Sequence, residues 1–170
     1  MITEAFTCLA KEMNDYFIRS FALAEDCVIV SAISNSDGTI ATNTANKIVI
    51  TLVNIQEDVA IKNNIGIRNR TLPDLPVAES LNLYFIIAAN FPNYKESLQF
   101  IFNAINFLKQ KSIFTPSETN GLTENIEKFI IEMVNMPTEN VLHLWAGLGA
   151  GYMPSAIYKM RLFYKTITPR

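Results

Sequence analysis

Two stretches of the chain carry apolar side chains on both faces of an expected strand, and this feature constrains the fold most. In residues 47–56, isoleucine, leucine and valine occupy both alternating sets of positions, and residues 80–89 repeat the pattern. A strand that is apolar on both faces must be covered on both faces. We therefore predict that these two strands lie near the centre of a sheet with material packed on it.

Helical periodicity appears in three other places. Apolar residues at three- and four-residue steps predict a helix over residues 3–22. Asn93 is a suitable N-cap for a second helix that runs to about Lys109. A third, short helix is predicted after Pro137, ended by a cluster of glycines that suits a C-terminal cap. The predicted apolar stripe of the second helix is Tyr94, Leu98, Ile101, Phe102, Ile105 and Leu108.

Short β-branched or alternating runs predict the remaining strands. These are residues 27–33, 126–135 and 156–164, of which the last two read as half-exposed. Consecutive strands early in the chain suggest antiparallel pairing. The polar stretch 34–46 and the weakly patterned stretch 57–78 are predicted loops.

These elements predict an α/β fold of the α+β kind, with a mixed, largely antiparallel sheet and helices packed on it. A length of 170 residues suits a single domain over residues 1–170. Charged residues make up 18% of the chain, below the roughly 25% of an average soluble domain. A surface with few charges favours buried contacts between subunits.

Charge and hydropathy argue against two kinds of partner. The net charge is −2 and the basic residues are scattered, so a nucleic-acid partner is not expected. No uninterrupted apolar run reaches the roughly 18–20 residues that span a bilayer, so direct membrane insertion is not expected. The N-terminus lacks the pattern of a signal peptide, and assembly in the cytoplasm is predicted.

Residue types that often act in catalysis occur in this sequence without partners at motif spacing. His143 has no partner at motif spacing and is predicted to be a partly buried structural histidine. Cys8 and Cys27 form no metal or redox motif and are predicted to be buried thiols. We therefore expect no enzyme activity, no catalytic residue, no metal site and no cofactor.

Several segments resemble one known family along nearly the whole chain. They are residues 47–58, 81–91, 114–116, 127–135, 142–155 and 158–161, and the block from Trp145 to Arg161 is the most specific. The family is the N-terminal domain of tube-terminator, or cap, proteins of extracellular contractile injection systems. The antifeeding prophage and the Photorhabdus virulence cassettes are examples of such systems.

The resemblance implies a fold akin to phage tail terminators and a structural role. Copies of the chain would form a homohexameric ring on the distal end of the inner tube. The ring would end tube growth and anchor the last sheath layer, with the tube protein and the sheath protein as partners. Whether the particle is released or docked on a membrane stays open.

A second function class also stays open, in which the chain is an adaptor that binds a partner peptide by strand addition. Either way, polar side chains of the loops and the half-exposed strands are the candidate interface residues. They are Asp37, Asn43, Asn46, Glu57, Asp58, Arg68, Arg70, Lys128, Glu132, Lys159, Arg161 and Lys165.

Overall fold

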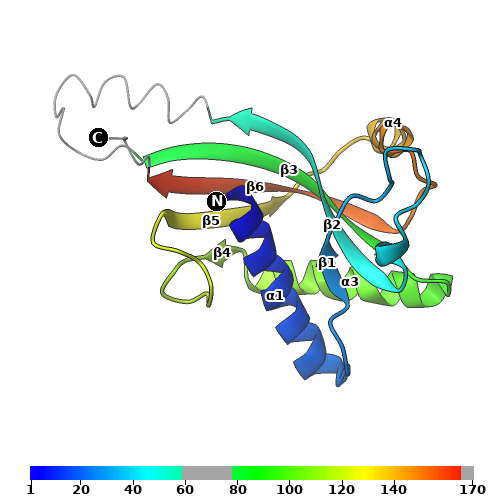
Figure 1. Ribbon diagram of the computed structural model, residues 1–170, viewed down its shortest axis with the longest axis horizontal. Helices are drawn as coiled ribbons and strands as arrows, with labels where there is room; N and C mark the ends of the chain where they lie inside the picture. The colour runs from blue at the N-terminus through cyan, green and yellow to red at the C-terminus, as the bar shows by residue number, and fades with distance from the viewer. Residues whose placement is uncertain (59–77, 166–170) are drawn as a thin grey trace.

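The computed structural model describes residues 1–58 and 78–165, in which helices lie on both sides of one curled sheet (Figure 1). The elements in chain order are α1 (Ile2–Phe21), β1 (Val28–Val30), a short 3₁₀ turn η1 (Thr42–Thr44), β2 (Lys47–Glu57), β3 (Ala78–Asn90), α3 (Tyr94–Gln110), β4 (Ile113–Phe114), β5 (Ile126–Met133), α4 (Thr138–Leu148) and β6 (Ser155–Lys165). Every predicted helix and strand is present. The two-residue strand β4 was not predicted, and most of the stretch 57–78 lies outside the described residues.

The six strands are ordered β1-β2-β3-β6-β5-β4, and all pairs are antiparallel except β1 with β2. The predicted mixed, largely antiparallel sheet is therefore confirmed. The expected antiparallel pairing of the first two strands is wrong, since Val28 pairs with Ile48 and Val30 with Ile50. Residues 31–46 are long enough to bring the chain back to the same end of the sheet, which a tight turn could not do.

Helices α1 and α3 cover one side of the sheet. Leu83, Phe85 and Ile87 of β3 point to this side and are fully buried. Phe6 of α1 meets the Phe85 ring edge-on at 5.3 Å between centroids. The apolar side chains that predicted β3 as a central strand thus form the surface on which both helices pack.

The apolar stripe predicted for α3 is wrong, because the buried face of the helix is rotated from it by part of a turn. Tyr94, Leu98 and Phe102 were expected in the core, yet all three are exposed. Phe100 and Phe107, which fell outside the predicted stripe, face α1 instead. Their rings lie 5.6 Å from Phe17 and 5.2 Å from Tyr16, respectively. Aromatic packing between the two helices decides the rotation of α3, and a single helix pattern does not contain that information.

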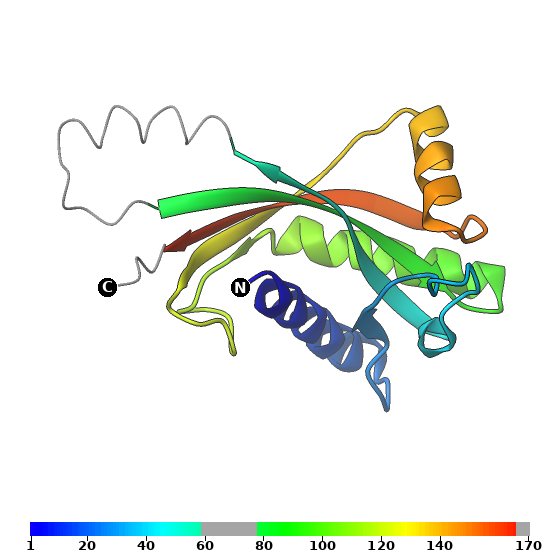
Figure 2. The same cartoon turned by 45° about the horizontal axis from the view of Figure 1, so that its top comes forward.

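Helix α4 covers part of the opposite side (Figure 2). Trp145 is buried there against Ile86, Ala88 and Ile157, and its indole N–H donates to Ser155 Oγ at 3.2 Å. Gly149 ends the helix in a left-handed conformation, φ 71°, as the glycine cluster predicted. The predicted partial burial of His143 is wrong, because that residue lies on the exposed face of α4.

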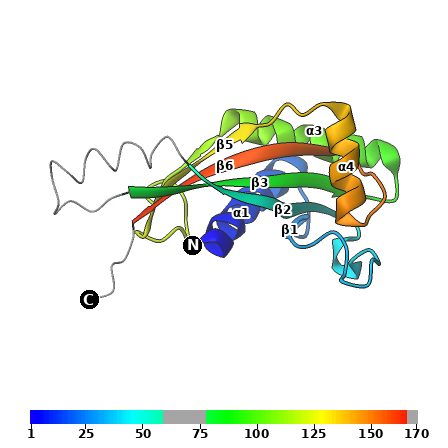
Figure 3. The same cartoon turned by 90° about the horizontal axis from the view of Figure 1, so that it is seen from above.

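Strand β6 lies between β3 and β5, so both of its edges are paired (Figure 3). A partner peptide therefore cannot add to β6 by strand addition. β4 pairs with β5 only at Ile113 and Phe114, opposite Ile130 and Phe129. The short β4 leaves the rest of the outer edge of β5 without a strand among the described residues.

A buried amide joins α1 to the edge of the sheet. Asn14 Nδ2 donates to the Val28 carbonyl at 2.9 Å. Asn14 Oδ1 accepts from the amides of Cys27 at 2.9 Å and Val28 at 2.8 Å. One side chain therefore satisfies three backbone groups where the chain enters β1, which explains a buried asparagine in the apolar face of a helix.

We expect Asn14→Leu to lower the free energy of unfolding by about 2–4 kcal/mol, because two amides and a carbonyl lose their partner. Urea unfolding followed by circular dichroism measures the change. Asn103→Leu is the matched control, since Asn103 bonds only to the Gln99 carbonyl of its own helix. Equal losses in the two variants would contradict a special role for Asn14.

Candidate functional site

Strands bring a group of the predicted interface residues together on one face of the sheet. Asp58, Lys128, Glu132, Lys159 and Arg161 come from the end of β2 and from β5 and β6. Strand alternation directs them to the side opposite α1 and α3, because their neighbours Phe129, Ile131, Met160 and Leu162 are buried beneath those helices. Lys165 continues the same alternation at the end of β6. We call these six residues, together with Phe163, the polar sheet face.

Two ion pairs cross this face and differ in burial. Lys159 Nζ lies 3.1 Å from Glu132 Oε2, and the Glu132 side chain is 52% exposed. Arg161 Nη2 lies 3.0 Å from Asp58 Oδ2, and the Asp58 side chain is 8% exposed. Screening makes an exposed pair weak, whereas a buried carboxylate depends strongly on its cation. The Arg161–Asp58 pair is thus part of the fold as well as of the surface.

Phe163 is a member of the face that the sequence analysis missed. The Lys128 ammonium lies 5.1 Å from its ring centroid, and the Arg161 guanidinium carbon lies 5.6 Å from it. Both distances suit cation–π contacts. The available signal was its position between Arg161 and Lys165 in the alternation of β6, on the polar rather than the apolar side.

Strand β3 adds polar atoms that were also missed. Ser80 pairs with Phe163 and Asn82 with Arg161 in the register of β3 and β6. Ser80 Oγ and Asn82 Oδ1 are inaccessible to solvent and have no hydrogen-bond partner within the described part of the chain. The charged side chains of the face comprise four cations and two anions, which is a surface suited to polar contacts.

The other predicted interface residues lie elsewhere. Asp37 accepts from the hydroxyl of Thr39 at 2.6 Å and from its amide at 2.9 Å, and these bonds lower the pKa of the Asp37 carboxyl. Asn43 Nδ2 donates to Ser31 Oγ at 3.1 Å, and Asn46 has a positive φ of 57°. These three residues shape the loop before β2 and do not join the polar sheet face.

The last three predicted interface residues are Glu57, Arg68 and Arg70, and their interface role stays a prediction. Glu57 is exposed at the end of β2, but its register partner Leu81 packs against the α1–α3 core, so Glu57 lies on the other side of the sheet. Arg68 and Arg70 lie outside the described residues.

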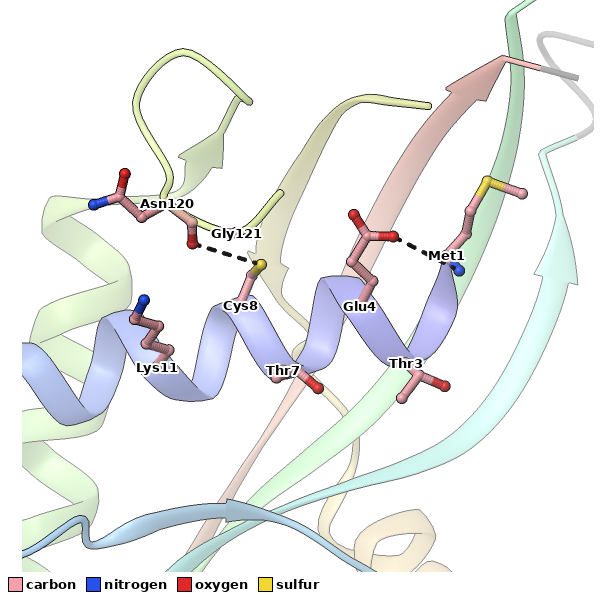
Figure 4. Close-up of a pocket in the computed structure, with 8 residues that line it drawn as sticks. All are labelled: Met1, Thr3, Glu4, Thr7, Cys8, Lys11, Asn120 and Gly121. Atoms are coloured by element: carbon pink, nitrogen blue, oxygen red, sulfur yellow. Dashed lines mark hydrogen bonds and ion pairs between the residues drawn. The ribbon is translucent and has the colours of Figure 1, made fainter. Parts of the chain in front are cut away.

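A shallow pocket at the start of α1, among the described residues, could hold a small molecule (Figure 4). Glu4 and Lys11 line it, and the Cys8 thiol faces the Asn120 carbonyl at 4.0 Å. Burial raises the pKa of the Cys8 thiol, so the thiolate that a nucleophile needs is scarce. Cys8 is thus not an activated nucleophile.

Buried thiols were predicted at Cys8 and Cys27, and both are buried and free. Burial raises the pKa of Cys27 to about 11. Within residues 1–58 and 78–165 no cluster of histidine, cysteine, aspartate and glutamate could hold a metal ion. Over the same residues, no helix has the length and apolar character needed to cross a membrane.

Comparison with known proteins gives one family match and similar solved structures. A family model described as the Pvc16 N-terminal domain matches residues 5–167. A "PVC sheath/tube terminator in extended state" from an extracellular contractile injection system has a TM-score of 0.54 at 15% identity, over 95% of this chain. The anti-feeding prophage cap, described as a "tube terminating cap", has a TM-score of 0.54 at 14% identity, over 94% of this chain.

The alignments cover 57% and 54% of those two chains, so this chain spans little more than half of their length. At such low identity, the likeness to the solved structures establishes the fold alone. No curated protein sequence matches the chain.

We expect Arg161→Met to lower the free energy of unfolding by about 1–3 kcal/mol, because the buried Asp58 loses a cation. Lys159→Met, the matched control on the same strand, should change it by no more than about 1 kcal/mol, because its partner Glu132 is exposed. Urea unfolding of both variants tests the contrast. A larger loss for Lys159→Met would overturn this ranking of the two pairs.

Proposed function

The chain belongs to the Pvc16 N-terminal domain family, and we propose that it forms the cap that terminates the inner tube of a phage-tail-like contractile injection system. This membership confirms the family that the sequence segments indicated. The observation that carries the proposal is the family match over residues 5–167, nearly the whole chain. The similar solved structures, a sheath/tube terminator and a tube-terminating cap, support the same role.

In this proposal six copies form a closed ring on the distal end of the tube. A ring of identical subunits uses two unlike surfaces, each meeting the other on the next copy, until rotation closes the set. Closure leaves no lateral surface free. A further tube subunit then meets the outer side of the ring rather than another tube subunit, and growth ends.

The polar sheet face is the surface that we assign to the tube or the sheath. It lies beyond α4, on the side of the sheet that no other described helix covers (Figure 3). Its four cations outnumber its two anions, so an acidic protein surface would complement it. Anchoring of the last sheath layer belongs to this proposal, as does assembly in the cytoplasm, where free thiols such as Cys8 and Cys27 persist. The role is structural and needs no catalysis.

Deletion of the gene from a strain that makes the particles is expected to give over-length tubes or a loss of closed particles. Electron micrographs of negatively stained particles measure tube length. Complementation with the unaltered gene is the control and should restore a narrow length distribution. Particles of normal length and number from the deletion strain would refute the cap role.

A charge swap tests the polar sheet face separately from folding. Lys159→Glu with Glu132→Lys keeps an ion pair at the same place, so the free energy of unfolding should change by less than about 1 kcal/mol. The pattern presented to a partner is reversed, so we expect complementation to yield at least about tenfold fewer particles. The counts come from the same micrographs.

The matched control is the swap Lys111→Glu with Glu12→Lys, an ion pair of 2.6 Å between α1 and the segment after α3, away from the polar sheet face. Normal particle numbers from the Lys159–Glu132 swap would show that this face contacts neither the tube nor the sheath.

A further inference from the structure

Three large apolar side chains form an exposed row on α3. Tyr94, Leu98 and Phe102 are spaced four residues apart and are 63%, 44% and 61% exposed. We call them the α3 stripe. The helix is already held to the protein by Ile101, Ala104 and other buried residues, so the stripe is not needed to fold it. A contiguous exposed apolar row on a helix marks an interaction surface.

Around the middle of the α3 stripe the helix surface is uncharged, and the nearest cation is Lys95, one turn before Leu98. The other accessible side chains between Leu98 and Asn106 are Gln99, Phe100, Asn103 and Ile105. The charges of α3 sit near its two ends, at Lys95, Glu96 and Lys109. Depletion of charge around aromatic side chains is typical of the core of a protein–protein interface. A partner that placed charges here would bury them without counter-ions, which is costly.

A second apolar surface lies on α4, one turn after the exposed Glu139. Residues 140–158 contain no aspartate, glutamate, lysine or arginine. Leu142 and Tyr152 are large, apolar and exposed in this segment, and Tyr152 meets the buried Trp145 ring edge-on at 5.6 Å. We call Leu142, His143 and Tyr152 the α4 surface. It matches the α3 stripe in kind, because both present large exposed apolar side chains; Lys95 lies three residues before Leu98, and Glu139 lies three residues before Leu142.

The two surfaces lie on opposite sides of the sheet. α3 packs on the core that contains Phe85, whereas α4 packs on the core that contains Ile86 (Figure 2). Unlike surfaces on opposite sides of one subunit produce head-to-tail contacts, which is the arrangement that a ring requires. A contact between two α3 stripes would instead give a two-fold dimer.

We propose that the α3 stripe of one copy binds the α4 surface of the next copy. This inference rests on the proposed ring and names the surfaces that join its subunits. The partner is thus a second copy of this chain rather than the tube or the sheath. The electrostatic match favours that choice, since the stripe has the cation Lys95 beside Leu98 and the α4 surface has the anion Glu139 beside Leu142, so the two apolar surfaces carry opposite charges at their margins.

Cysteine cross-linking tests the pairing directly. Leu98→Cys and Leu142→Cys are made separately in the full chain, and each is treated with a short bismaleimide alone and after mixing. Both variants and their parent carry Cys8→Ser, because Cys8 lines the pocket at the start of α1, whereas Cys27 is buried with its thiol pKa raised to about 11 and should not react. We expect a covalent dimer from the mixture and no dimer above the parent from either variant alone.

The double variant Leu98→Cys/Leu142→Cys, isolated in particles, should give a ladder of cross-linked species that ends at the hexamer. Two results would overturn the pairing. One is a dimer from Leu98→Cys alone, which indicates a two-fold contact between stripes. The other is the absence of cross-links both in concentrated solution and in particles, which indicates that another partner covers the stripe.

A second variant separates this inference from the proposed function. Leu98→Asp/Phe102→Asp should leave the unfolding midpoint near that of the parent, since both side chains are exposed, and should reduce restored particles at least about tenfold in the deletion strain. Ile18→Asp, an exposed apolar residue of α1, is the control and should restore them. Normal particles from the stripe variant, in a strain where deletion abolishes them, would refute the pairing but not the cap role.

Discussion

The need to cover β3 on both of its faces is the constraint on which the rest of the structure depends. Leu83, Phe85 and Ile87 point to one side, Ile86 and Ala88 point to the other, and all five are buried. Burial of each of the four larger side chains contributes about 1.5–3 kcal/mol to the stability of the fold. Helices α1 and α3 provide the cover on one side and α4 provides it on the other.

Helix α4 covers only part of its side of the sheet, and the side chains of β3 change from apolar to polar where that cover ends. Toward α4, the strand presents Ile86 and Ala88, but further along the same face it presents Ser80, Asn82 and Tyr84. The neighbouring strands change in the same way, from apolar residues to ion pairs. The polar sheet face is therefore the uncovered continuation of a core, and its position follows directly from the length of one short helix.

The alternation of side chains between two faces predicted most of the strands, because this two-residue period is a property of the local sequence and does not depend on what the strand packs against. The phase of α3 could not be predicted in the same way. Phe100, Phe102 and Phe107 are equally apolar, and the aromatic rings of α1, together with Phe91 and Phe114, decide which of them are buried. The direction of β1 and the burial of Asn14 depend on where a loop of sixteen residues, 31–46, returns the chain. Lys159 and Arg161 were identified from the alternation of β6, whereas their pairing with Glu132 and Asp58 depends on strand order, which no single segment encodes.

The place of β6 in the sheet has a consequence for how the protein is made. β6 comes after every other described element in the chain, yet it lies between β3 and β5 and joins the two halves of the sheet. Until residues 155–165 have left the ribosome, β3 lacks one neighbour and β5 has only β4. Contacts between strands so distant in sequence form slowly. We therefore expect the nascent chain to stay incompetent for association until residues 155–165 have emerged, which keeps subunits that lack β6 out of growing particles.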